Sequence, residues 1–167
     1  MRRTLVPIAV AALATWVADA AFAGVPVTLR TPGSEFVELR SGNGRAVVTG
    51  RGSLGLNIRS GRLRIVDLPR GGRPNLTNRC RRRARRVSPT TLEIVGRRIG
   101  CVIWSGEDGG RWQAVLRGRL IDASGKVRGS LTLDGVERGP TGRFSIGADG
   151  SWANWPRNAR TYGLDRT

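Results

Sequence analysis

The residues with the clearest chemical potential in this sequence are six arginines crowded around one cysteine. They form the run RCRRRARR and are Arg79, Arg81, Arg82, Arg83, Arg85 and Arg86. Guanidinium groups bind phosphate, sulfate and carboxylate groups through paired hydrogen bonds. The run therefore predicts a surface that docks on a polyanion. The alternative is a solvated loop pinned by a disulfide, because runs of like charge are commonly exposed without a ligand.

The charge of the whole chain points the same way but is less specific. The 167 residues include 29 basic and 12 acidic ones, which gives a formal net charge of +17. Such a field concentrates anions near the protein in a salt-dependent manner. Lys126 is the single lysine, and the even spread of arginine indicates coding bias. Arginine richness by itself therefore does not identify a ligand.

Cysteine and histidine usage restricts the chemistry further. The chain has two cysteines, Cys80 and Cys101, and no histidine. Two cysteines in an exported chain predict one disulfide, which would stabilise the fold by roughly 3 kcal/mol. Without histidine there is no Ser-His or Cys-His nucleophile pair and no usual zinc ligand set. We expect no metal site and no cofactor.

Carboxylate chemistry remains as the catalytic alternative. The closest acidic pairs are Glu107 with Asp108, and Asp134 with Glu137. Glycoside hydrolases use two carboxylates that face each other across a cleft. Both pairs lie in glycine-containing turn sequences, where aspartate has a conformational role. We therefore expect a non-catalytic protein, with a carboxylate-based glycan hydrolase as a second alternative.

Two tryptophans near the C-terminus are candidate aromatic contacts. Trp152 and Trp155 lie in the stretch GRFSIGADGSWANWPRNAR, close to Arg157 and Arg160. Large aromatic side chains at a closing edge commonly bury area in the core. An exposed pair beside arginines would instead bind a sugar or a protein partner. The sequence leaves both interpretations open.

The first 23 residues have the pattern of a secretory signal peptide. Arg2 and Arg3 precede an apolar stretch, and small residues end at Ala23, which is typical of such leaders. An uncleaved anchor is the alternative, although Asp19 interrupts the apolar stretch and a spanning helix needs about 20 apolar residues. Cleavage leaves residues 24–167 as a single domain with a net charge of +16, outside the cytoplasm and without a transmembrane segment.

Most of this domain alternates polar and apolar residues with a period of two, which is typical of half-buried antiparallel strands. Glycine-containing dipeptides predict the turns: Asn43-Gly44, Ser60-Gly61, Asp108-Gly109, Ser124-Gly125, Asp134-Gly135 and Asp149-Gly150. The expected strands are Val25 to Leu29, Phe36 to Leu39, Arg45 to Thr49, Ser53 to Arg59, Arg62 to Asp67, Leu92 to Val95, Ile99 to Trp104, Arg111 to Leu120, Lys126 to Leu133, Arg143 to Ile146 and Thr161 to Leu164. Many short strands predict an all-β fold, either an antiparallel β-sandwich or a closed β-barrel, preceded by the signal peptide helix.

The basic region at about residues 70–90 interrupts this strand pattern. Thr77 or Asn78 could cap a helical turn that ends before Pro89. Arginines four residues apart repel one another and oppose a helix. We therefore predict a loop or a frayed turn, tied by Cys80 to the strand that carries Cys101.

Several stretches together resemble a group of known proteins. They are GRAVVTGRGSLGL, GRLRIVDL, the cysteine-bearing basic segment and GRFSIGADGSW. With the signal peptide, they are similar to small secreted glycine- and arginine-rich proteins of high-GC actinobacteria. The resemblance implies a β-rich exported domain, and it implies no functional residues.

The sequence therefore predicts a non-catalytic exported β-domain of the cell envelope that binds an anionic polymer through the arginine run. Anionic cell-envelope polymers or lipid headgroups are the expected partners. Nucleic acid is not expected, because the chain is predicted to leave the cytoplasm and has few aromatic residues for base stacking. A structural or protein-docking module without a polyanion ligand is the alternative.

Overall fold

The structure is a computed structural model that describes residues 28–30, 36–68, 76–105, 110–147 and 151–164. These residues form an all-β fold without a helix, as the sequence predicts. The predicted signal peptide, residues 1–23, lies outside them. No helix that could cross a membrane occurs in the described part of the chain. The strands are β1 (Thr28–Arg30), β2 (Phe36–Leu68), β3 (Leu76–Cys80), β4 (Arg85–Ser88), β5 (Thr91–Ser105), β6 (Arg111–Gly135), β7 (Arg143–Ile146), β8 (Ala153–Asn154) and β9 (Arg160–Gly163).

Three strands are much longer than predicted. β2 has 33 residues, β5 has 15 and β6 has 25, and each contains segments that we expected to be separate strands. The dipeptides Asn43-Gly44, Ser60-Gly61 and Ser124-Gly125 lie inside β2 and β6, so the hairpin turns predicted there are wrong. Glycine bends these strands without ending their pairing. Asp108-Gly109 and Asp149-Gly150 lie outside the described residues.

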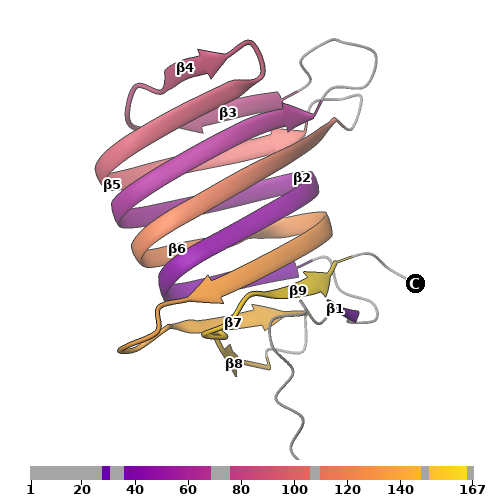
Figure 1. The fold of residues 1–167 in the computed structure, drawn as a ribbon. Coiled ribbons are helices and arrows are strands. Elements are labelled where there is room, and N and C mark those ends of the chain that lie inside the picture. The colour runs from indigo at the N-terminus through magenta and orange to yellow at the C-terminus, as the bar shows by residue number, and fades with distance from the viewer. Residues whose placement is uncertain (1–27, 31–35, 69–75, 106–109, 148–150, 165–167) are drawn as a thin grey trace, which may run out of the picture.

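β2 and β6 wind around each other. Val48 of β2 pairs with Ala114 on one side and with Leu131 on the other, and both pairings are antiparallel. The two partners lie 17 positions apart in β6, so β6 returns to the same point of β2 one layer further on. Figure 1 shows β2, β5 and β6 crossing the molecule, bending at its sides and returning behind.

The sheet is open. Its strands follow the order β1-β9-β6-β2-β5-β3, with β4 on β5 and β7 on β2. The strands at the two ends of this path do not pair with each other, so the closed barrel is wrong. One continuous sheet bends back on itself, and its front and back walls face each other as the two layers of a sandwich do (Figure 1).

The hydrophobic core lies between these walls. Apolar side chains from alternate positions of β2, β5 and β6 point inward, and Ile58, Leu63, Leu116 and Ile121 are fully buried. Trp112 is the largest of the buried side chains contributed by the long strands. Residues between them point outward, which is why arginine is abundant on the outer surface.

A column of glycines lies where the long strands bend. Gly135, Gly44, Gly118, Gly61 and Gly96 are successive cross-strand neighbours from β6 through β2 to β5. We call these five residues the glycine column. Gly61 has a φ of +153°, and a Cβ there would lie 2.1 Å from the carbonyl oxygen of Arg117. A side chain at Gly61 would therefore force the neighbouring strand to shift.

Candidate anion-binding surface

The arginine run, Arg79–Arg86, forms part of the free edge of the sheet. Its start belongs to β3, its end belongs to β4, and both strands pair with β5. Residues 81–84 connect them, with a bend at Arg81 and Arg82. The predicted loop or frayed turn is therefore wrong for the two ends of the run. Pairing with β5 satisfies backbone groups of the run without the repulsion between arginines four residues apart that opposes a helix.

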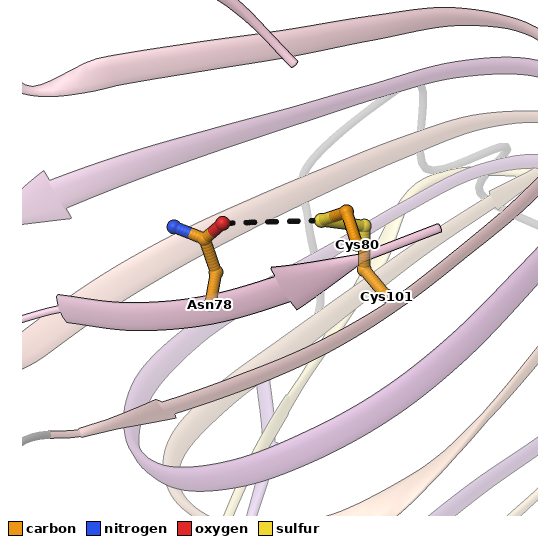
Figure 2. The surroundings of a disulfide bond; sticks show 3 residues. All are labelled: Asn78, Cys80 and Cys101. Carbon is orange, nitrogen blue, oxygen red and sulfur yellow. Dashed lines mark hydrogen bonds between the residues drawn. A yellow bond between two sulfur atoms is a disulfide. The ribbon is translucent and has the colours of Figure 1, made fainter. Parts of the chain in front are cut away.

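The predicted disulfide is confirmed. Cys80 and Cys101 are direct cross-strand partners in β3 and β5, and their Cα atoms are 4.1 Å apart. Figure 2 shows the bridge, with Oδ1 of Asn78 lying 3.9 Å from Sγ of Cys80. The bridge joins the arginine run to a strand whose Cys101 is buried in the core.

The arginines of the run have different neighbours. Arg79 and Arg81 line a hollow on the outer face. The guanidinium of Arg82 lies over Gly96, at one end of the glycine column. Its Nη1 is 3.3 Å from the position that a Cβ on Gly96 would occupy. Arg83 is exposed. The run is therefore continuous in sequence but does not form one patch.

The last two arginines of the run are held by the protein itself. Nη2 of Arg85 donates to Oε2 of Glu93 at 3.0 Å, and Nη1 of Arg86 donates to the carbonyl oxygen of Pro89 at 3.0 Å. Arg62 also approaches Glu93, at 3.7 Å. The hydrogen bond from Arg85, with the charges of Arg62 and Arg64, lowers the pKa of Glu93 below its ordinary value of 4.5. Arg85 and Arg86 are therefore less available to a ligand than Arg79–Arg83.

The outer hollow has a volume of about 730 Å³. Gly55 and Gly100, which have no side chains to fill it, are among the residues that line it. Arg40 from β2, Arg79 from β3 and Arg81, which follows β3, are among the lining residues. The hollow can therefore surround an anionic group with several charged donors.

Two carboxylates also line the hollow, and both make contacts within the protein. Glu38 Oε1 accepts hydrogen bonds from Nη2 of Arg40 at 2.7 Å and from its Nε at 2.9 Å. Asp122 Oδ1 accepts a hydrogen bond from the backbone N–H of Ser41 at 2.8 Å. Ser41 has a φ of +52°, so Asp122 supports an unusual backbone conformation. These contacts give both acids a structural role.

The two candidate tryptophans have different surroundings. Trp152 is half-buried, and the guanidinium carbon of Arg40 lies 4.6 Å from the centre of its ring. Trp155 is 1% exposed and packs on Gly42, where a Cβ would overlap the ring. Trp152 therefore lies beside an arginine of the outer hollow, whereas Trp155 belongs to the core.

Of the two acidic pairs considered for catalysis, the structure describes one. Asp134 lies near the end of β6, and Glu137 is exposed in the turn that follows. Glu107 and Asp108 lie outside the described residues. Within the described ranges, no group of three or more acidic or cysteine side chains could hold a metal ion.

The sequence analysis did not identify the arginines beside the glycine column. Arg45, Arg62, Arg97 and Arg119 each follow a residue of the glycine column. The signal was a Gly-Arg step repeated along the chain. Only the pairing of the strands shows that these steps lie side by side.

Comparison with known proteins gives no match, because no family model fits the chain and no curated protein or solved structure is significantly similar to it.

Proposed function

We propose that the protein is a non-catalytic, exported β-domain that binds an anionic polymer of the cell envelope, with the arginine run among its contacts. The observation that carries the proposal is the state of the arginines at the sheet edge. Arg79, Arg81, Arg82 and Arg83 are exposed, and none has an acidic partner among the described residues. No internal ion pair has to be broken before an oxyanion forms charge-assisted hydrogen bonds with these groups.

The disulfide supports this role because it fixes the run on a rigid strand. A site held on paired strands loses less conformational entropy on binding than a site on a free loop. It also fits export, since disulfides persist in oxidising compartments.

The alternative role for the run is protection of the sheet edge. The path of strands ends at β3, so its outer backbone groups are unpaired with other strands. Charged side chains on such an edge prevent pairing with another molecule. This is the structural module without a polyanion ligand, and it predicts aggregation of arginine-free variants rather than loss of ligand binding.

The test measures binding of the full oxidised domain to purified anionic cell-wall polymer at several salt concentrations. The substitutions Arg81→Ser, Arg82→Ser and Arg83→Ser are combined in one variant. We expect the dissociation constant to rise at least about tenfold, and its dependence on salt to become shallower, because each released counterion contributes to the salt slope.

A matched control removes three exposed arginines at the opposite end of the sheet, namely Arg138, Arg157 and Arg160. This control keeps the same net charge as the test variant. Equal losses in both variants would show that total charge, and not the run, determines binding. No salt-sensitive binding by the unmodified domain would reject the proposed function.

Export has its own test. Expression with the N-terminal segment in a bacterial host should release a species that begins at Gly24 and carries the Cys80–Cys101 disulfide. Mass spectrometry with and without reduction measures both features. A full-length, reduced species found only in the cytosol would contradict export.

A further inference from the structure

Two columns of arginines flank the glycine column. Arg45, Arg117 and Arg62 are successive cross-strand partners on one side of it. Arg119 and Arg97 lie on the other side and both pair with Ser60. All five arginines are exposed. Because each lies next to a glycine of the column, the two columns are separated by two strand positions, or about 7 Å.

The cross-strand contacts within the first column are unfavourable in isolation. Arg117 lies directly opposite Arg45 on one side and Arg62 on the other. Like charges at directly opposed positions destabilise a sheet. Arg45 and Arg117 form no ion pair within the described residues. A bound oxyanion would remove this repulsion.

Acidic groups lie at the margins of this surface. Asp134, near the end of β6, pairs with Arg45 at one end. Glu93 accepts ion pairs from Arg62 and Arg85 beside the other end. Arg82 lies over Gly96, so the arginine run adds a sixth guanidinium at that end. Carboxylates therefore lie at both ends of the line of arginines.

The dimensions of the glycine column with its flanking arginines, which we call the strip, favour a linear ligand. Pro156 and Arg157 cover Gly135. The four glycines from Gly44 to Gly96 span three steps between strands, or about 14 Å at about 4.8 Å for each step. The absence of side chains along the centre lets a chain approach the backbone closely. Bases stack on exposed aromatic side chains. Among the described residues, no such side chain adjoins the glycine column. The strip therefore suits a flexible chain of oxyanions better than a nucleic acid.

We propose that the glycine column and its flanking arginines, Arg45, Arg62, Arg97, Arg117 and Arg119, bind a single extended polyanion chain that runs across the strands, with Arg82 at one end. The inference rests on the proposed function and assigns it to a second surface. The recognised chemistry is a series of oxyanions along one chain. Its source is either the sulfate and carboxylate groups of a glycan or the phosphates of a phosphate polymer.

The test compares two variants that each lose two arginines paired across β2 and β6. Arg45→Gln with Arg117→Gln removes two groups of the strip. Arg51→Gln with Arg128→Gln removes a cross-strand pair away from the glycine column. Heparin fragments of increasing length and inorganic polyphosphate are the probes, binding is measured by calorimetry at several salt concentrations, and thermal unfolding checks the fold.

For the unmodified domain, we expect affinity to rise with fragment length until the fragment fills the strip and then to level off. The strip variant should bind the long fragments about tenfold more weakly and the shortest fragments little differently, whereas the control variant should bind as the unmodified domain does. A preference for heparin over polyphosphate would identify the glycan source, and the reverse would identify the phosphate source.

Equal losses in the two variants would overturn the strip while leaving polyanion binding intact. Tighter binding of single-stranded DNA than of heparin with the same number of charges would also overturn it. No binding of either polymer by the unmodified domain would instead reject the proposed function. If the strip variant unfolds at a lower temperature, Arg97→Gln with Arg119→Gln tests the other column in the same way.

Discussion

In the arginine run, residues that are adjacent in sequence have side chains with different neighbours, whereas in the glycine column residues far apart in sequence are neighbours in the fold. The run is one stretch of eight residues, yet its side chains reach the outer hollow, Gly96 of the glycine column and Glu93. The column and its arginines come from three strands between Gly44 and Gly135, yet they are neighbours in successive layers. A dense cluster of charge in the sequence is therefore spread out by the fold, and dispersed Gly-Arg steps are gathered.

The two regions also differ in what supports them. The run is held at an edge by one disulfide and by pairing with a single strand, β5. Three of the column's five glycines, Gly44, Gly61 and Gly118, have a paired strand on each side. We therefore expect the column to be rigid and integral to the fold and the run to be separable from it.

The strongest test of this difference is a side chain in the column. Gly61→Ala should lower the free energy of unfolding by about 3 to 5 kcal/mol, because the positive φ and the contact with the Arg117 carbonyl oxygen both oppose a Cβ. Urea unfolding measures the effect. Gly55→Ala is the matched control in the same strand, since its Cβ would meet nothing closer than 3.7 Å. A change of less than about 1 kcal/mol is expected there, and similar losses at both glycines would contradict the role of the column.

Removal of the disulfide should have the next largest effect. Cys80→Ala with Cys101→Ala opens a loop with a sequence separation of 21 residues and should cost roughly 3 kcal/mol of unfolding free energy. Hydrogen exchange should rise in β3 and β4 and stay low in the β2 and β6 pairs around Gly61. Uniform loss of protection would show that the edge and the column unfold as one unit.

A smaller effect separates two neighbouring arginines of the run. Arg82→Gln should weaken polyanion binding about threefold, because Arg82 lies at the end of the strip, and exposed charge contacts contribute about 0.2 to 1 kcal/mol. Arg83→Gln removes the same charge one residue away and should have less effect. Calorimetry with the same polymer measures both. A larger effect at Arg83 would place the ligand on the run alone.

The smallest expected effect is a pH dependence at the edge. The lowered pKa of Glu93 means that its pairing stabilises the fold above the ordinary carboxyl value of 4.5, and that this contribution is lost as pH falls through the lowered pKa. The difference in melting temperature between the unmodified domain and Glu93→Gln should therefore shrink from pH 6 to pH 3. A difference that stays constant over this range would exclude the ion pairs as its source.

Local pattern was sufficient to predict the type of structure and several strands. Alternation predicted β7 over the residues it occupies, Arg143–Ile146. The turn prediction from glycine-containing dipeptides failed at Ser60-Gly61 and Ser124-Gly125, because a dipeptide that allows a hairpin also allows a bend in a continuous strand. Which of these forms depends on partners that lie far away in sequence.

The candidate surface was predictable only in part. The run identified Arg79–Arg83, and the two cysteines identified the disulfide. The strip was not predictable, because Arg117 becomes a neighbour of both Arg45 and Arg62 only when β6 lies between two passes of β2. The hollow was not predictable for the same reason.

The sequence by itself determined that this chain forms strands, that its two cysteines can form one bridge and that its outer surface is rich in guanidinium groups, because alternation and composition act locally. The tertiary structure decided that the strands coil in one open sheet, and which arginines lie side by side. The physical reason is cross-strand pairing. It joins residues by register rather than by sequence distance, and the offset of 17 residues that aligns the glycines arises only when the layers stack.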